Sequence, residues 1–192
     1  MKYRVNEIFL SLQGEGFWTG TPMVFLRLSG CNLACPFCDT DFTAFKEMEA
    51  DEIVAELLNV AGECRRVCIT GGEPLLQLES GLVDALHRAG FTIHLETNGT
   101  IEAPDGIDWI TVSPKAGLKL KKSNELKLVF QGSDEAYIEG FRSFDAGNFF
   151  LQPCDTGSPE NSAAILGQCI AYIKSHPWWR LSLQTHKLLG IR

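Results

Sequence analysis

The sequence lacks any apolar run near the roughly 18 uninterrupted residues that a membrane-spanning helix requires. Its first residues, MKYRVNEIFLSLQGEG, also lack the long apolar segment and the small-residue cleavage site of a secretory signal. We therefore expect a cytoplasmic protein without a membrane partner. Low-complexity tracts, internal repeats and long linkers are missing too, so secondary structure is predicted from hydrophobic periodicity.

A surplus of positive charge is missing as well. The 192 residues carry 17 Lys and Arg against 24 Asp and Glu, a formal net charge of -7. Nucleic-acid binding needs cationic side chains to neutralise phosphates, so we expect no nucleic-acid partner. The lysine-rich segment KAGLKLKKSNELK (115–127) is interpreted as a solvated loop. Lys115 is excluded from this interpretation and is considered below. The length and the 45% apolar content fit one globular domain over residues 1–192.

Seven cysteines are present, an odd number. Without a secretory signal, a disulfide framework is less favoured than metal or cluster chemistry. Cys68, in the apolar run RVCIT, and Cys169, in the helical pattern AAILGQCIAYI, are predicted to be core residues. The residues around Cys64 and Cys154 leave their roles open.

Apolar runs of strand length alternate with amphipathic helical patterns. We predict strands at 22–30, 65–72, 91–99, 108–114, 125–132, 148–153 and 179–185, and helices at 51–62, 73–90, 134–144 and 161–176. Such alternation predicts an α/β fold with a mainly parallel sheet and ligands at the carboxyl ends of its strands. Only about ten residues separate the strands at 91–99 and 108–114, too few for a whole helical crossover. We therefore expect an incomplete, open TIM-type barrel with fewer helices than strands.

The segment GCNLACPFCDTDF (30–42) places three cysteines, Cys31, Cys35 and Cys38, within eight residues. Thiolates at this density favour zinc or an iron-sulfur cluster. A structural zinc needs four protein ligands, and no fourth Cys or His occurs between Phe17 and Glu63. A cubane cluster leaves one iron open, and an irregular loop with these spacings suits it. A non-catalytic zinc module and unliganded thiols stay as alternatives.

The C-x3-C-x2-C spacing, with Phe37 before the last cysteine, resembles the cluster loop of the radical S-adenosylmethionine (SAM) enzymes. That resemblance implies that the three cysteines hold a 4Fe-4S cluster whose open iron binds SAM. The segment ITGGEPLL is similar to the family's GGEP motif, and LETNG, VSPK and LQPCD are similar to its other strand ends. The resemblance implies a SAM site made of Phe37, Cys38, Asp39, Gly71, Gly72, Glu73, Glu96, Ser113, Pro114, Lys115, Gln152, Pro153, Cys154 and Asp155.

Within that site, the resemblance implies that Glu96 contacts the ribose of SAM and that Gln152 contacts its adenine. Taken in isolation, the same segments are ordinary turns. Glu96 before Asn98-Gly99 would then be part of a β-hairpin signal.

The segment SLQGEG (11–16), together with Arg27, CDT and the tail LQTHKLLGIR, resembles one subgroup, the 7-carboxy-7-deazaguanine synthases. The likeness runs from Ile8 to Arg192. It implies conversion of 6-carboxy-5,6,7,8-tetrahydropterin to 7-carboxy-7-deazaguanine with loss of ammonia, started by a 5'-deoxyadenosyl radical, with SAM as a reusable cofactor. It further implies Mg²⁺, an electron donor such as flavodoxin or ferredoxin, and a homodimer.

The subgroup resemblance implies a substrate site made of Leu12, Gln13, Gly14, Glu15, Arg27, Thr70, His186 and Arg192. Glu15 would accept N-H groups from the pterin, and Arg27 would bind the pterin carboxylate, although Asp39 is an alternative structural partner for Arg27. Thr40 would be the magnesium ligand, unless Asp39 and Thr40 merely cap a turn.

We expect the tail to fold over the barrel on the apolar anchors Leu188, Leu189 and Ile191. His186 and the Arg192 carboxylate would then face the substrate. Trp178 and Trp179 are core residues or a dimer contact. The nearest functional alternative is a glycyl-radical activating enzyme, which shares the cysteine spacing but acts on a partner protein.

Overall fold

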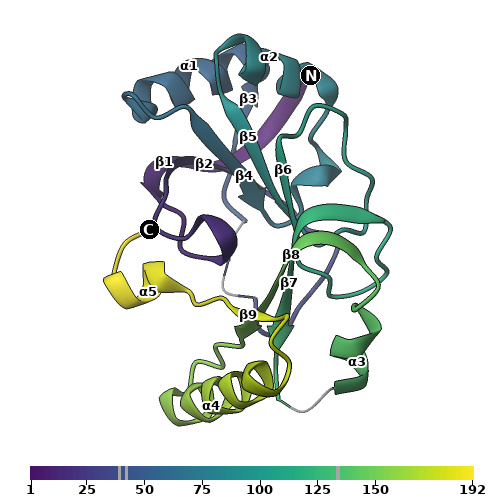
Figure 1. Ribbon diagram of the computed structural model, residues 1–192. Coiled ribbons are helices and arrows are strands. Elements are labelled where there is room, and N and C mark those ends of the chain that lie inside the picture. The colour runs from purple at the N-terminus through teal and green to yellow at the C-terminus, as the bar shows by residue number, and fades with distance from the viewer. Residues whose placement is uncertain (39, 42, 133–134) are drawn as a thin grey trace.

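The computed structural model describes residues 1–38, 40–41, 43–132 and 135–192, and the strands of this part form one sheet of nine (Figure 1). The sheet order is β3-β1-β2-β4-β5-β6-β7-β8-β9. The bounds are β1 (Lys2–Leu12), β2 (Pro22–Leu28), β3 (Lys46–Glu49), β4 (Arg66–Gly71), β5 (Thr92–Thr97), β6 (Trp109–Val112), β7 (Lys122–Phe130), β8 (Asp145–Pro153) and β9 (Arg180–Leu181). From β2 to β9 every pairing is parallel, whereas β1 is antiparallel to β2 and β3. The open, mostly parallel sheet confirms the predicted fold class.

Helices pack on the outer side of this sheet, and a last short helix lies in the C-terminal tail. Their bounds are α1 (Ala50–Ala61), α2 (Ser80–Arg88), α3 (Glu135–Gly140), α4 (Pro159–Ser175) and α5 (Thr185–Leu189), with 3-10 turns η1 (Gly16–Trp18) and η2 (Pro74–Leu76). Helix α1 packs on β1 and β2, α2 packs on β5, and α4 packs on β8 and β9 (Figure 1). The connections from β5 to β6 and from β6 to β7 contain no helix, which confirms the predicted shortage of crossovers. No described helix is long and apolar enough to cross a lipid bilayer.

Strand alternation separates an apolar outer face from a polar inner face. On β2 and β4, Leu26 and Ile69 point outward and are fully buried in the core beneath α1 and α2. Their neighbours along the strands, which include Arg27 and Thr70, point to the opposite face, and β7 likewise alternates Leu126 with Lys127. The inner face therefore collects polar side chains inside the open barrel.

An aromatic group closes the barrel near the first residues of β6. Trp18 of η1 makes edge contacts with His94 and Trp109, with ring centroids 5.1 and 5.4 Å apart, and Phe17 lies 5.0 Å from Trp109. Burial, together with the charge of Arg66, lowers the pKa of His94 to about 4, so this imidazole is neutral at physiological pH. The barrel is therefore accessible from the carboxyl ends of its strands.

Three details differ from the predictions, and a fourth selects one of two predicted alternatives. The helix predicted at 73–90 is broken, and α2 begins only at Ser80. The reason is that the Gln77 side chain donates to Ser29 O (2.7 Å) and accepts from Arg4 N (2.7 Å), which fixes the preceding turn against β1 and β2. Strands β1 and β3 were not predicted, and β5 runs parallel to β6, so the Asn98-Gly99 hairpin interpretation is wrong. Trp179 is a core residue, 2% exposed.

Candidate active site

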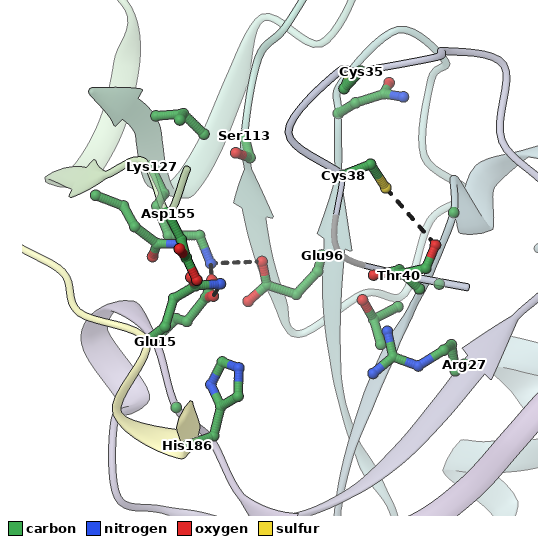
Figure 2. Close-up of a pocket in the computed structure, with 18 of the residues that line it drawn as sticks. Glu15, Arg27, Cys35, Cys38, Thr40, Glu96, Ser113, Lys127, Asp155 and His186 are labelled. Atoms are coloured by element: carbon green, nitrogen blue, oxygen red, sulfur yellow. Dashed lines mark hydrogen bonds and ion pairs between the residues drawn. The ribbon is translucent and has the colours of Figure 1, made fainter. Parts of the chain in front are cut away.

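A cavity of about 510 Å³ opens at the carboxyl ends of the parallel strands. Nearly all of the site residues predicted from the sequence line it, although they come from segments far apart in the chain (Figure 2). Those that line it are Leu12, Gln13, Gly14, Glu15, Arg27, Cys31, Cys35, Phe37, Cys38, Thr40, Thr70, Gly71, Gly72, Glu96, Ser113, Lys115, Gln152, Pro153, Cys154, Asp155, His186 and Arg192.

Two predicted residues are placed differently, and a third cannot be compared. Glu73 is fully buried beside the cavity, and its carboxylate accepts from Leu75 N (3.0 Å), Thr97 Oγ1 (2.7 Å) and Asn98 N (2.8 Å). It therefore ties the end of β4 to the end of β5. Pro114 faces a neighbouring hollow on the other side of the cysteine loop. Asp39 lies outside the described residues.

The two glycines at the end of β4, Gly71 and Gly72, pack directly against the end of β2 and the start of the cysteine loop. Gly72 N donates to Leu28 O (3.2 Å) and Glu73 N donates to Gly30 O (2.9 Å). A Cβ atom on Gly72 would lie 2.1 Å from Gly30 O, which only glycine avoids. The glycines therefore have a structural role of their own, in fixing the cysteine loop to the sheet.

The cysteine loop forms one wall of the cavity. Burial raises the pKa of Cys35, the Lys115 charge opposes that shift, and the nearby Cys31 and Cys38 add to it. Within the described ranges no three His, Cys, Asp or Glu side chains are arranged to hold a metal ion. Three cysteine thiols on one irregular segment are nevertheless the donor set that an iron-sulfur cluster requires, so the residues fit the predicted group by their chemistry.

The other four cysteines lie outside the cysteine loop. Cys68 and Cys169 are fully buried, as predicted, and burial raises the pKa of Cys169 to about 12. Cys154 is buried at the cavity wall, and Cys64 donates from Sγ to the Pro22 carbonyl (3.4 Å). The Cys64 contact lies at the surface end of β2, away from the cavity.

Lys127 lines the cavity and interacts with both Glu15 and Glu96 (Figure 2). Its Nζ is 2.6 Å from Glu15 Oε2 and 3.0 Å from Glu96 Oε2, and its side chain is only 5% exposed. The interpretation of segment 115–127 as a solvated loop is therefore wrong for Lys127, which faces inward from the middle of β7. A lysine inside the apolar run ELKLVF was the available sequence signal.

These contacts determine the charges on the cavity floor. Burial opposes ionisation of Glu15, but the Lys127 charge and hydrogen bonds from Lys127 and Gln184 outweigh it and lower the pKa to about 2. Burial raises the pKa of Glu96, and Lys127 only partly offsets that effect. Burial also disfavours the charged form of Lys127, yet Glu15, Glu96 and Glu125 together raise its pKa well above the usual range.

Arg27 makes its ion pair with Glu7 of β1, between Nε and Oε1 at 2.8 Å. Glu7 also pairs with the guanidinium of Arg192. Neither interaction was predicted, because the antiparallel partner strand β1 was not recognised in the sequence. Arg27 lies on the same side of the cavity as Thr40 (Figure 2).

The tail folds over the cavity, as expected, but its anchors are polar. Thr185 donates from N and from Oγ1 to Gly14 O, both at 2.9 Å, and His186 packs directly on Gly14. The predicted anchors Leu188, Leu189 and Ile191 are 75%, 64% and 39% exposed, so that expectation is wrong. Arg192 instead reaches β1 through its pair with Glu7.

A second group of unpredicted residues fixes the Glu15 loop. Gln184 Nε2 donates to Glu15 Oε1 (3.0 Å), and Ser182 Oγ accepts from Gly16 N (2.9 Å) and donates to Gln152 Oε1 (2.8 Å). The side-chain oxygen of Gln152 thus accepts a hydrogen bond from another side chain of the protein. Ser182 and Gln184 lie in the predicted strand 179–185, and Gln184 is also part of the tail motif, but neither pattern indicates these roles, since they depend on contacts between the tail and the first loop.

Comparisons with known proteins agree with this geometry. The profile of the Radical SAM superfamily matches residues 26–147. A 7-carboxy-7-deazaguanine synthase of Bacteroides thetaiotaomicron is 48% identical, and one of Bradyrhizobium diazoefficiens is 46% identical, each over 100% of both chains. The crystal structure of QueE from Escherichia coli superposes with a TM-score of 0.76 at 28% identity, covering 95% of this chain and 94% of that one.

Proposed function

Because the chain belongs to the radical SAM superfamily and, within it, to the family of 7-carboxy-7-deazaguanine synthases, we propose that it is a carbon-nitrogen lyase of deazapurine biosynthesis. Its reaction would convert 6-carboxy-5,6,7,8-tetrahydropterin to 7-carboxy-7-deazaguanine with loss of ammonia. The observation that carries the proposal is one cavity that unites the three-cysteine loop with a buried, charged floor. A glycyl-radical activating enzyme would have no need for that floor.

The cofactor side of the cavity comprises the cysteine loop and the strand ends. Cys31, Cys35 and Cys38 would hold a 4Fe-4S cluster, and SAM would lie along the ends of β4 to β8. When bound, the reduced cluster and SAM supply the radical that starts the reaction. Glu96 and Ser113 line this side and offer hydrogen-bonding groups to the cosubstrate.

The substrate side comprises Glu15, Arg27 and the tail. With a pKa of about 2, Glu15 is fully ionised at neutral pH and only accepts hydrogen bonds, which suits the N-H groups of an aminopyrimidine edge. Arg27 would bind the pterin carboxylate. His186 and Arg192 cover the opening, so the tail would exclude water and complete the substrate contacts.

Further features of the family are proposed for this chain on chemical grounds. Thr40 would contribute an oxygen ligand to Mg²⁺, which would complete its coordination with the substrate carboxylate and water. A flavodoxin or ferredoxin would deliver the electron, and the active protein would be a homodimer.

The test is anaerobic reconstitution with iron and sulfide, followed by incubation with SAM, reductant and the carboxypterin. The expected result is a brown protein that forms 7-carboxy-7-deazaguanine and ammonia in equal amounts. A colourless, zinc-containing protein would contradict the cluster. A reconstituted protein that cleaves SAM only with a captured partner protein would instead support a glycyl-radical activating enzyme.

A further inference from the structure

We infer that Lys127 is a positioning residue for both ligands at once, an inference that rests on the proposed function. Its ammonium group holds Glu15 toward the pterin and Glu96 toward SAM. Loss of this one side chain should therefore weaken both ligands together. The sequence resemblance assigned Lys127 no role in the site.

The geometry shows one buried cation shared by two carboxylates from distant segments. Lys127 projects from the middle of β7, whereas Glu15 follows β1 and Glu96 is near the end of β5. Gln13 links the same pair, because its Nε2 donates to Glu96 Oε1 (3.4 Å) and its Oε1 accepts from Glu15 N (3.1 Å). A shift of either carboxylate would therefore be transmitted to the other through Lys127 and Gln13.

Other titratable groups face this cluster from β7 itself, from β4 and from the segment after β6. Glu125 lies two residues before Lys127 on β7, Cys68 faces Glu96 from β4, and Lys115 approaches from the segment after β6. Lys115 donates to Ser113 O (3.0 Å) and Oγ (3.1 Å). Arg27 is paired with Glu7. In the described part of the chain, Lys127 is thus the cation in direct contact with both carboxylates.

Removing that cation would leave two buried carboxylates of the same sign. Such a pair keeps a shared proton to higher pH than either group alone, because burial and mutual repulsion both disfavour the doubly ionised form. A protonated carboxyl group donates a hydrogen bond where the ligand needs an acceptor. The loss of ligand affinity should therefore be largest at low pH and decrease as the pH rises. A loss of affinity caused only by altered packing would not depend on pH.

The experiment uses Lys127→Met in the reconstituted holoprotein, with Lys122→Met as the matched control. Lys122 lies on the same strand but is exposed. Anaerobic calorimetry at pH 6.5 and 8.5 measures the affinity for SAM and, with SAM present, for the carboxypterin. In Lys127→Met both affinities should fall about tenfold or more at pH 6.5. The loss should be smaller at pH 8.5, where the carboxylates are ionised and only their lost positioning remains, since the population of a protonated group changes about tenfold per pH unit. Lys122→Met should match the unmodified protein.

Three results would overturn the inference: unchanged affinities, a loss confined to one ligand, or an equal loss at both pH values. An unmodified protein that binds SAM but no pterin would refute the proposed function instead, and the SAM titrations would still test Lys127. If Lys127→Met does not fold, the double variant Lys127→Met with Glu96→Gln removes one unpaired carboxylate and should restore folding. A double variant that unfolds equally readily would refute the counter-ion role.

Discussion

Gly14→Ala should undock the tail from the cavity. The backbone of Gly14 has an ordinary φ, but an added Cβ would lie 2.1 Å from His186 Nδ1 and 2.9 Å from His186 Cβ. Because the clash reaches the base of the imidazole side chain, a rotation of His186 cannot relieve it. Helix α5 must move away, and the two hydrogen bonds from Thr185 to Gly14 O are then lost.

The magnitude follows from those two bonds. Each contributes a net ~1 kcal/mol, so docking of the tail should weaken by about 2 kcal/mol. That free energy corresponds to roughly a 30-fold shift toward the undocked state. If the tail completes the pterin site, the pterin dissociation constant should rise by up to this factor, while SAM affinity stays unchanged.

Calorimetry with each ligand measures the affinities, and amide hydrogen exchange over residues 184–192 reports undocking. Gly81→Ala serves as control, because a Cβ at Gly81 meets open space. In a His186→Ala background, Gly14→Ala should have a smaller effect, since the contacts with Nδ1 and Cγ are gone and only the contact with the Cβ atom at position 186 remains. Normal pterin affinity combined with faster exchange would show that the tail takes no part in the substrate site, and unchanged exchange would refute the steric argument itself.

Further predictions follow from the same contacts. Cys38→Ala should prevent assembly of an intact cluster, whereas Cys169→Ala should lower only the unfolding free energy, by ~1–2 kcal/mol; equal iron contents would contradict the assignment. Thr40→Val should weaken stimulation by Mg²⁺ and leave SAM binding intact, so an unchanged Mg²⁺ titration would return Thr40 to a turn-capping role. Glu73→Gln should lower the urea unfolding free energy by about 1–3 kcal/mol, because one amide N-H must face a backbone or hydroxyl donor; unaltered unfolding would refute this. Burial raises the pKa of Glu125 to about 7. The folded protein therefore binds this proton more tightly than the unfolded chain, and the resulting stability is fully present below about pH 4.5 and is lost as pH rises through 7. Glu125→Gln should remove that decline in unfolding free energy, roughly 3 kcal/mol, and parallel pH profiles of the two proteins would disprove it.

Local sequence patterns were sufficient for most strands and for the chemistry of the cysteine loop. The runs around Val67, Ile93 and Leu128 are strongly apolar and bounded by turn residues, and each is a strand of the sheet. The short interval between Glu96 and Trp109 correctly predicted a crossover without a helix. The spacing of three cysteines and the motifs at the strand ends identified which segments meet at one edge of a parallel sheet.

Other features were not predictable because they depend on contacts between distant segments. The break before Ser80 results from Gln77 reaching β1 and β2, which overrides a continuous helical pattern. Strand β1 mixes charged and apolar residues, and only pairing with β2 and β3 makes it a strand. The tail was expected to dock through leucines, yet its hydrogen-bonding groups bind Gly14 and Glu7.

The sequence by itself determined the fold class, the family and many of the residues that surround the cavity, because motifs, spacing and periodicity are local properties of the chain. Tertiary structure alone decided the charges within that cavity. Lys127, Glu15 and Glu96 lie up to 112 positions apart, and their ionisation depends on burial and on distances of about 3 Å. Folding brings these groups together away from water, where electrostatic interactions are strong, and this gives a lysine from an apparently solvated segment its place in the site.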